Sequence, residues 1–403
     1  MLSRDEMSTL FQVGVQAADP AQAVHRACTA LAHTAPTHVI AFGKAACAMA
    51  SAALNVLPSP RHAIVVTNPE NARPVAGADL WTAAHPVPDG NGQRAANAIM
   101  AMLEAASGDD RVLALVSGGA SALLPAPVAG LSLDDKAEVS RVLLGAGLDI
   151  VAMNAVRQHL SQLKGGGFVR IAAPAPVTAL ILSDVIGDDL RAIASGPTAS
   201  PLLPRAEVVE LLHAAQLWEQ LPAAARTALS RTESQPLLTE ARNILIGSNA
   251  KSLDAMAAAR KDAHRDPEPL VGDVADAAQR VVAQLHAGPG ITLMGGETTV
   301  QLRGDGRGGR NQELALRVAL ALDGRAGWRF LSAGTDGRDG PTEAAGAIVD
   351  GTTCARIRTK GGDPEQLLAN NDSFAALELA GDLLITGGTG TNVADLQILS
   401  VAK

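Results

Sequence analysis

A short glycine-rich segment flanked by two hydroxyls offers the clearest phosphate-binding chemistry in this sequence. Ser117-Gly118-Gly119-Ala120-Ser121 directly follows the apolar run Val112–Val116. Two glycines allow a ligand to approach the main chain closely, and the N–H groups at the start of a helix point toward a bound anion. An ordinary tight turn between a strand and a helix would have a similar composition. The segment is therefore a candidate phosphate cradle and does not identify one by itself.

A lysine is expected at the same edge of the sheet. Gly43-Lys44 ends the apolar run His38–Phe42, and a stretch of small residues typical of a helix follows. A single lysine after a strand is usually a solvated loop residue. Lys44 becomes a stronger candidate for binding phosphate if the glycine-rich segment at 117–121 lies beside it. The two would be neighbours if they follow adjacent parallel strands, because the carboxyl ends of such strands meet at one edge of the sheet.

A second basic segment is predicted at the end of a helix. The helix expected over Ile150–Leu163 carries Asn154 and Arg157, and Lys164-Gly165-Gly166-Gly167 follows it. Glycine commonly ends helices, so a flexible helix end is one interpretation. Three glycines beside two cations exceed what a helix end requires. We expect Arg157 or Lys164 to hold the carboxylate of an acidic substrate, a task that suits arginine.

Several acids fall in the loops that follow predicted strands. Asp184 and Asp188 come after Val177–Leu182, Glu297 comes after Ile291–Met294, and Asp336 follows Phe330-Leu331. Each acid alone is typical of a helix cap or a turn. Mg²⁺ needs only one or two carboxylates together with substrate phosphates. We therefore expect Asp184 and Asp188 to bind Mg²⁺ or to orient an acceptor hydroxyl, and the sequence does not separate these roles.

The segment Gly304–Gly309 formally matches the G-x-G-x-x-G pattern of dinucleotide-binding proteins. The acid at a suitable distance, Asp323, is expected at the end of a helix, whereas the fingerprint acid ends a strand. The helix behind the glycines begins with Arg310, which fits an anion clamp equally well. We interpret this segment as a glycine-rich phosphate loop or hinge.

Two well-known nucleotide signatures do not occur in the sequence. There is no G-x-x-x-x-G-K-[ST] segment, which excludes a P-loop enzyme, and the protein-kinase set of H-R-D followed by D-F-G is absent, because D-F-G does not occur in the sequence. Any phosphate site must be built from other glycine-rich turns.

These segments share one arrangement, in which a strand is followed by a glycine turn and then a helix. The pattern predicts an α/β fold with a Rossmann-like, doubly wound sheet, which binds ligands at the carboxyl ends of its strands. A proline-interrupted helical region, Pro197–Glu240, is the candidate boundary between domains. We predict an N-terminal domain over residues 1–235 and a C-terminal α/β domain over residues 236–403.

Composition narrows the class of protein further. The chain has 403 residues, a formal net charge of −8 and only three cysteines, none of them in a C-x-x-C pair. An acidic protein repels nucleic acid and anionic membranes, so we expect neither as a partner. The first residues do not have the pattern of a signal peptide, and no uninterrupted apolar stretch is long enough for a membrane span. A cytoplasmic location is the expectation.

The ordered set of motifs resembles the glycerate 2-kinase family, the class with a C-terminal MOFRL domain, from Leu10 to Val401. The segments that carry the resemblance are Phe42–Ala46, His85–Asp89, Ser117–Leu123, Asn154–Ser161, Lys164–Gly166, Ser183–Asp188, Ser195–Thr198, Gly295–Val300, Gly308–Glu313, Gly334–Gly337, Asn370–Ser373 and Thr389–Val393. Each is short, but their order makes the set highly specific. Ala120 and Gly388 depart from the glycine and the proline usual in the family, both in loops expected to line the site.

The resemblance implies two domains with the active site in the cleft between them, and Lys44 and Arg310 as the catalytic cations. It implies ATP-dependent phosphorylation of D-glycerate, with 2-phosphoglycerate as product, ATP and Mg²⁺ as cofactors, and a homodimer as a candidate assembly. The substrate- and phosphate-binding residues expected from the motifs are Ser117, Gly118, Gly119, Ser121, Asn154, Arg157, Lys164, Asp184, Asp188, Glu297, Asp336 and Asn371.

Two other functions stay open at this point. Some relatives have been labelled hydroxypyruvate reductase, and an NAD(P)H-dependent reductase would use the Gly304–Gly309 match. A non-catalytic sensor of small molecules is the third candidate. A sensor has no need for converging catalytic cations, so we place it last.

Overall fold

The computed structural model describes residues 1–31, 35–231, 241–286 and 288–402, and it divides the chain into two compact α/β units. One unit consists of Pro20–Ile246, here called the central unit. The other joins Met1–Asp19 to Gly247–Lys403 and is called the terminal unit. The boundary predicted at residues 235/236 lies outside the described residues. The structure differs from the predicted division at the start of the chain, because the first 19 residues belong with the C-terminal half.

The central unit is built on a doubly wound sheet whose strand order, in the described residues, is β3-β2-β1-β4-β5-β6. This is the strand order of the Rossmann fold. The pairings of β1 with β2 and β4, of β2 with β3 and of β4 with β5 are all parallel. The strands are β1 (His38–Phe42), β2 (His62–Thr67), β3 (Asp79–Thr82), β4 (Val112–Val116), β5 (Val177–Leu182) and β6 (Arg242–Gly247).

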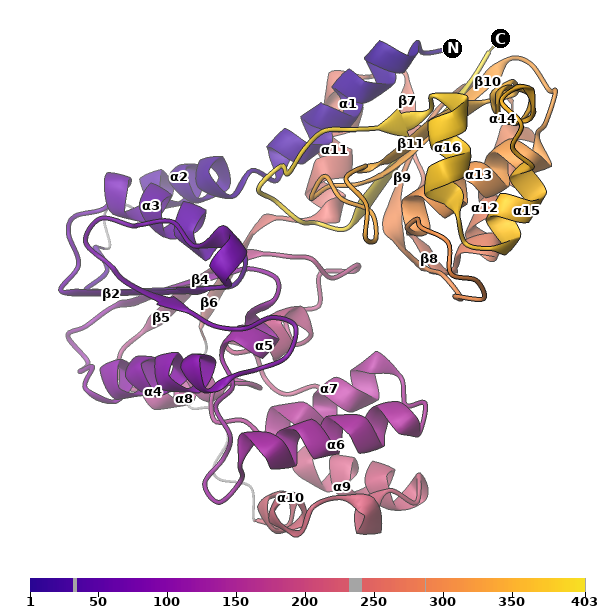
Figure 1. Cartoon of the computed structure of the whole chain (residues 1–403). Helices are drawn as coiled ribbons and strands as arrows, with labels where there is room; N and C mark the ends of the chain where they lie inside the picture. The colour runs from indigo at the N-terminus through magenta and orange to yellow at the C-terminus, as the bar shows by residue number, and fades with distance from the viewer. Residues whose placement is uncertain (32–34, 232–240, 287, 403) are drawn as a thin grey trace. The chain divides into compact units, whose positions relative to one another are not determined.

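Helices cover both faces of this sheet (Figure 1). Helices α2 (Pro20–Leu31) and α3 (Ala46–Val56) lie on one face, and α4 (Gly90–Glu104) and α8 (Gly167–Ala172) lie on the other. Strands β1 and β4 are buried along their whole length, which is why their sequences are continuous apolar runs without alternation. Chain order along the sheet reverses between β1 and β4, and ligands bind at such a switch point in open α/β sheets.

A group of helices extends the central unit beyond its sheet. Helices α6 (Leu133–Gly145), α7 (Ile150–His159), α9 (Arg205–Ala214) and α10 (Ala223–Leu229) share a separate apolar core. Val139 and Leu143 of α6 pack in it against Val156 of α7. Ser132 caps α6 through a reciprocal hydrogen-bonded capping box, and Asp149 caps α7. Helix α7 ends at His159, which is earlier than the predicted end at Leu163.

The terminal unit has a mixed sheet. Within the described residues its order is β12-β11-β10-β13-β9-β7, with β8 paired to β9. The pairings among β12, β11, β10, β13 and β9 are antiparallel, and β7 and β8 run parallel to β9. The strands are β7 (Ala263–Arg265), β8 (Leu270–Asp273), β9 (Gly290–Thr299), β10 (Trp328–Gly334), β11 (Gly346–Asp350), β12 (Leu383–Leu384) and β13 (Asp395–Val401).

Each face of the mixed sheet has its own helical cover. The apolar core on one face is formed with α12 (Val274–His286) and α13 (Arg310–Ala321). The core on the other face is formed with α1 (Arg4–Ala17) and α11 (Asn249–Ala259). Three shorter helices, α14 (Thr353–Thr359), α15 (Pro364–Ala369) and α16 (Ser373–Ala380), complete the unit.

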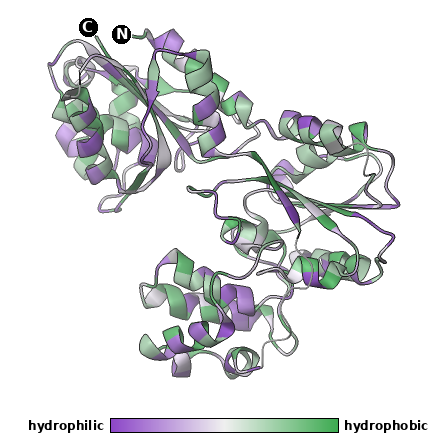
Figure 2. Ribbon diagram, turned by 180° about the vertical axis from the view of Figure 1, so that it is seen from behind, coloured by the Kyte–Doolittle hydropathy of each residue, from purple (hydrophilic) through white to green (hydrophobic). Residues whose placement is uncertain are grey.

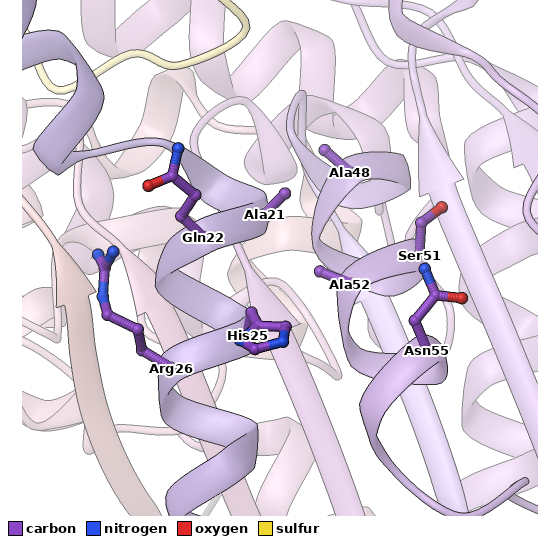
Figure 3. A pocket seen from close by; sticks show the side chains of 8 residues that line it. All are labelled: Ala21, Gln22, His25, Arg26, Ala48, Ser51, Ala52 and Asn55. Carbon is purple, nitrogen blue, oxygen red and sulfur yellow. The ribbon is translucent and has the colours of Figure 1, made fainter.

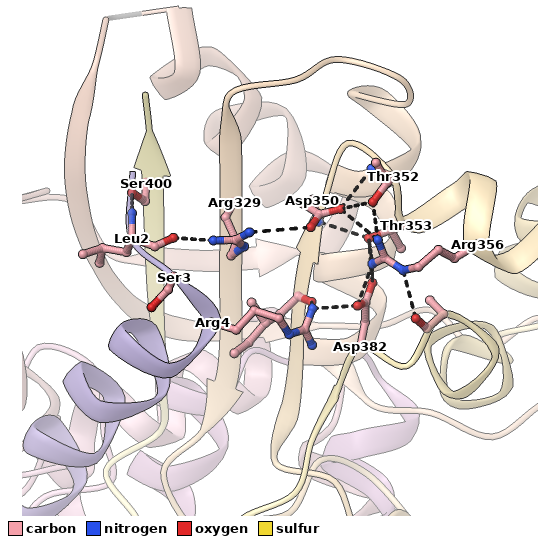
Figure 4. A network of polar contacts seen from close by, with 12 residues as sticks. Leu2, Ser3, Arg4, Arg329, Asp350, Thr352, Thr353, Arg356, Asp382 and Ser400 are labelled. Carbon is pink, nitrogen blue, oxygen red and sulfur yellow. Dashed lines mark hydrogen bonds and ion pairs between the residues drawn. The ribbon is translucent and has the colours of Figure 1, made fainter. Parts of the chain in front are cut away.

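A polar network explains why the first residues belong to the terminal unit (Figure 4). Arg4 Nη1 donates to Asp382 Oδ1 at 2.7 Å and to the carbonyl oxygen of Ile348 at 2.8 Å. Asp382 is 1% exposed and also accepts from Thr353 Oγ1 and from Arg356 Nη2. The Leu2 N–H donates to Ser400 Oγ at 2.8 Å. One buried carboxylate thus anchors both the N-terminal helix and α14 to the mixed sheet.

The distribution of hydropathy agrees with this layered arrangement (Figure 2). Helices carry hydrophilic and hydrophobic residues side by side, as expected for elements with one buried face. No helix in the described ranges combines the length and the apolar character that crossing a membrane requires.

Replacing Asp382 by alanine tests the role of this network. The change leaves Arg4 and Arg356 without their buried partner, and we expect the free energy of unfolding to fall by roughly 2–4 kcal/mol. Urea unfolding followed by circular dichroism measures the loss. Glu378→Ala, at an exposed position of α16, is the matched control and should change stability little. Equal stability of the two variants would contradict the anchoring role.

Candidate active site

Two turns at the switch point of the central sheet are hydrogen-bonded to each other. Lys44 N donates to the carbonyl oxygen of Gly118 at 2.9 Å, and Ala45 N donates to Ser117 Oγ at 3.1 Å. Gly43 has φ +122°, and a Cβ there would overlap Ser117. The Lys44 side chain is exposed, whereas Ser117 is buried. The structure therefore brings Lys44 beside the predicted phosphate cradle.

Three titratable side chains pack against the glycines of this cradle. A Cβ on Gly118 would overlap the carboxylate of Asp184, and one on Gly119 would lie 3.1 Å from Lys44 Cγ and 3.3 Å from the His85 ring. Burial raises the pKa of Asp184, and the nearby Lys44 charge opposes that shift. Burial and the Lys44 charge both lower the pKa of His85. Lysine, carboxylate and imidazole thus surround one turn, although sequence reasoning assigned no role to His85.

The cradle is linked to a second loop through a pair of serines. Ser121 Oγ and Ser195 Oγ are 2.8 Å apart and share a hydrogen bond. The Ser195 carbonyl oxygen accepts from Gly165 N at 3.1 Å, next to Lys164. Ser195 has φ +62° and the preceding Ala194 has φ +52°, which are rare values for residues with a side chain. These contacts connect the phosphate cradle to the basic segment predicted at the end of α7.

Three cations gather near that segment without an acid to neutralise them. Lys136 of α6 joins the predicted Arg157 and Lys164, and no salt bridge or side-chain hydrogen bond to them occurs among the described residues. Burial, together with the charge of Arg157, lowers the pKa of Lys136 to about 8. Burial, together with the charges of Lys136 and Arg157, places the pKa of Lys164 well below its usual value.

The sequence held a signal for Lys136 that the motif analysis missed. Lys136 precedes Val139 and Leu143 by three and seven residues, and that spacing places all three on the same face of a helix. A lysine on an apolar helix face must either extend to solvent or meet a partner. Here its Nζ is inaccessible to solvent.

Asp188, the second predicted Mg²⁺ ligand, has a carboxylate oxygen without a hydrogen-bond donor in the described residues. Asp188 Oδ1 is buried and accepts no hydrogen bond from the described residues, and Asp188 has φ +55°. A buried carboxylate oxygen without a donor suits a cation or a hydroxyl group. No group of three or more acids, histidines or cysteines in the described ranges could hold a metal alone. A divalent ion would need substrate phosphates as further ligands, as Mg²⁺ usually does.

Arg310 is held rigidly at the start of α13 in the terminal unit. Its Nε and Nη2 donate to the two oxygens of Asp395 at 2.7 and 3.0 Å, and its Nη1 donates to Glu297 Oε1 at 2.7 Å. Burial acts to lower the pKa of Arg310, but the hydrogen bonds and charge of Asp395 raise it. Three of the five guanidinium N–H donors are used, so two remain for a ligand. Sequence reasoning missed Asp395, which begins β13 and is 1% exposed.

The glycines at 304–309 are explained by close packing. A Cβ on Gly304 or Gly306 would overlap Asn370, and one on Gly308 would overlap Ser373. The helix behind them is already capped, because Asp339 accepts from Asn311 N at 3.1 Å and from Gln312 N at 2.8 Å. Burial and the charge of Asp395 raise the pKa of Asp339 to about 7. A dinucleotide would need the same N–H groups for its pyrophosphate.

The other predicted residues have differing surroundings. Asn371 serves the fold, since its Oδ1 accepts from Arg303 N at 2.7 Å and its Nδ2 donates to Glu313 Oε2 at 3.1 Å. Asp336 Oδ1 accepts from the Arg338 N–H at 3.0 Å. Asn154 is half-buried on α7, one turn before Arg157. Their roles toward a ligand stay predictions.

Two surface hollows lie away from these groups. One, of about 560 Å³, is formed by small side chains of α2 and α3, with His25 and Arg26 at its edge (Figure 3). The other, of about 340 Å³, lies between α12 and α13 and includes Leu368 of α15. Neither contains a predicted site residue.

Comparison with known proteins defines the class to which the fold and these residues belong. Residues 6–230 match the family described as a domain of unknown function, DUF4147, and residues 290–395 match the MOFRL family. The crystal structure of a glycerate kinase from Thermotoga maritima superposes with a TM-score of 0.91 at 36% identity and covers 98% of both chains. The chain is thus a two-domain α/β protein of the DUF4147–MOFRL class.

Named relatives give the family more narrowly. A D-glycerate 2-kinase of Thermotoga maritima is 40% identical over 375 residues, which is 89% of each chain. The human glycerate kinase is 37% identical and covers 90% of this chain and 84% of its own. A provisionally named hydroxypyruvate reductase of Agrobacterium vitis is also 37% identical, over 99% of this chain and 94% of its own. This chain belongs to the glycerate kinase family, and the predicted resemblance is confirmed.

The packing of Asp184 against Gly118 can be tested by substitution. Gly118→Ala forces the carboxylate away from the turn, and we expect a loss of about 1–3 kcal/mol in the free energy of unfolding. Gly90→Ala is the matched control, because nothing lies within 4 Å of a Cβ at that helical position. Denaturant unfolding of both variants measures the difference, and an unchanged Gly118→Ala protein would refute the contact.

Proposed function

We propose that this protein transfers the γ-phosphoryl group of ATP to the 2-hydroxyl of D-glycerate and so forms 2-phosphoglycerate. The observation that carries the proposal is the position of Lys44 and Asp184 on the glycine turn at the switch point of the central sheet. The similarity to relatives named glycerate kinase, over most of the chain, supports it.

The glycine turn is suited to phosphate. Phosphoryl transfer needs positioned donors and cations around the moving group and little covalent chemistry from the protein. Ser117, Gly118, Gly119 and Ser121 supply the turn, and Lys44 supplies the charge. Asp184 is half-buried against Gly118 and near Lys44, and its raised pKa makes it a base suited to accept the proton of the acceptor hydroxyl.

We propose Mg²⁺ as a partner of the nucleotide phosphates. Asp188 would hold it through the buried oxygen that lacks a donor. The ion would neutralise charge on the transferring group. In this proposal Asp184 is assigned to the acceptor hydroxyl and Asp188 to Mg²⁺.

Arg310 is proposed to stabilise the same phosphoryl group through its two remaining N–H donors. Asp395 fixes the plane of the guanidinium, so we assign it a positioning role. Glu297, whose side chain is 45% exposed, forms the weaker of the two ion pairs and is the one that an arriving phosphate would replace. Lys44 and Arg310 are the two catalytic cations that the family resemblance implies.

The reductase alternative has less support. It rested on Gly304–Gly309, where close packing against Asn370 and Ser373 accounts for the glycines and Asp339 occupies the start of the helix. A sensor would not need Lys44 and a base at the same turn. The preference for ATP, a homodimeric assembly and a cytoplasmic location stay predictions.

Removing either catalytic cation should abolish most turnover. We expect Lys44→Met and Arg310→Met each to lower kcat by roughly 10³–10⁵, because each loses charge stabilisation of the transferring group. ADP release with D-glycerate, ATP and Mg²⁺ measures the rate, and circular dichroism verifies folding. The exposed residues Lys261 and Arg325 offer matched controls as Lys261→Met and Arg325→Met. Near-normal kcat in both site variants would remove the mechanism.

A parallel assay separates the kinase from the reductase. The wild-type protein should release ADP with D-glycerate and should not consume NADH or NADPH with hydroxypyruvate. Consumption of a reduced nicotinamide without ADP formation would reverse the assignment.

The two acids should respond differently to Mg²⁺. Asp184→Asn removes the base, and we expect kcat to fall by about 10²–10⁴ at every Mg²⁺ concentration. Asp188→Asn should raise the Mg²⁺ concentration needed for half-maximal rate and recover much of its activity at saturation. Mg²⁺ titrations of steady-state rate measure both effects, and the opposite pattern would exchange the roles.

A further inference from the structure

The basic triad is the name used here for Lys136, Arg157 and Lys164. These three neighbouring cations have no acidic side chain paired with them in the described residues. Each side chain comes from a different segment, namely α6, α7 and the loop before α8. Lys136 Nζ and Arg157 Nε are both inaccessible to solvent, and neither has a hydrogen-bond partner in the described residues. Like charges that are buried together without a counter-ion are strongly unfavourable. A bound anion would satisfy these donors.

Two hydrogen bonds, both involving Ser195, link the loop that carries Lys164 to the phosphate cradle. Gly165 N, next to Lys164, donates to the Ser195 carbonyl oxygen at 3.1 Å, and Ser195 Oγ shares a hydrogen bond with Ser121 Oγ at 2.8 Å. Gln158 of α7 also donates to the Ser195 carbonyl oxygen, at 3.1 Å. These contacts connect the segments that carry Arg157 and Lys164 to the C-terminal end of the phosphate cradle.

We infer that Lys136, with Arg157 and Lys164, binds the carboxylate of the acceptor acid, and that Lys136 is a specificity-determining residue that selects 2-hydroxy acids over neutral polyols. The inference rests on the proposed function. In a 2-hydroxy acid the carboxylate is bonded to the carbon that bears the reacting hydroxyl. Fixing the carboxylate on the triad would therefore place that hydroxyl near the phosphate cradle.

The charge state of the triad agrees with this role. Burial and neighbouring cations lower the pKa of Lys136 to about 8 and place the pKa of Lys164 well below its usual value, so both lysines hold their protons weakly unless an anion lies beside them. A carboxylate would reverse that shift by favouring the charged lysines. Among the described residues, no acidic side chain forms a salt bridge or a side-chain hydrogen bond with these three groups.

The test is the variant Lys136→Met, which keeps the length of the side chain and removes the charge. Calorimetric titration with D-glycerate, without nucleotide and in a buffer free of small anions, should show roughly 10–100-fold weaker binding. Glycerol, which lacks the carboxylate, should bind neither protein measurably. In turnover the KM for D-glycerate should rise by a similar factor, and the KM for ATP should stay unchanged. Arg141→Met, at an exposed site on the same helix, is the matched control.

A second readout distinguishes a binding role from a structural one. Removing an uncompensated buried charge should raise the Tm of the ligand-free protein by roughly 2 °C or more and should shrink the Tm gain produced by D-glycerate. A structural lysine would instead lower the Tm on removal. Lys136→Gln provides the same comparison if the methionine variant does not fold.

The outcomes separate this inference from the proposed function. Normal D-glycerate affinity in both Lys136 variants of an active kinase would overturn the inference alone. A raised KM for ATP with unchanged D-glycerate binding would assign the triad to phosphate and would overturn it as well. Binding of D-glycerate that depends on Lys136, in a protein without phosphoryl transfer, would support the inference and overturn the proposed function.

Discussion

Buried positive charge without a counter-ion is the constraint on which the rest of the central unit depends. The chain carries a net charge of −8, so an anionic substrate meets repulsion at long range and must be attracted locally. Many arginines elsewhere are paired with acids, as Arg4 and Arg356 are with Asp382. Lys136, Arg157 and Lys164 are not so paired within the described part of the chain. A bound anion would offset the unfavourable free energy of burying these three charges together.

The doubly wound sheet determines where that ligand lies. Its order reverses between β1 and β4, and both strands end in turns that hydrogen-bond to each other, because Lys44 N donates to the Gly118 carbonyl oxygen and Ala45 N donates to Ser117 Oγ. Asp184 reaches the same turn from the end of β5. The terminal unit contributes Arg310, whose guanidinium is hydrogen-bonded to Asp395 and Glu297, so that its remaining N–H donors point in a fixed direction. The central unit supplies cations that have no acidic partners among the described residues, and the terminal unit supplies an arginine whose orientation is fixed by two acids.

Local patterns predicted much of the first unit. The runs over residues 38–42, 112–116 and 177–182 are the observed strands β1, β4 and β5, because fully buried parallel strands are continuous apolar runs. The turns that follow were recognisable because each begins directly after one of these apolar runs. Lys136 had a local signal, its position on the apolar face of a helix, but its proximity to Arg157, 21 residues later, could not be predicted from that signal. Asp395 was missed because the residue it holds, Arg310, lies 85 residues earlier. The grouping of the N-terminal helix with the C-terminal half could not be read locally either, since Asp382, which binds Arg4, lies 378 residues later.

Phosphorus NMR of the product tests the central claim most directly. After incubation of the protein with ATP, Mg²⁺ and D-glycerate, a phosphomonoester resonance should appear. It should be split into a doublet, because the phosphate at C2 couples to the single proton on that carbon. A triplet would indicate transfer to the CH₂ hydroxyl at C3 and would contradict the assigned acceptor. No new monoester resonance from a folded protein would contradict phosphoryl transfer to D-glycerate altogether.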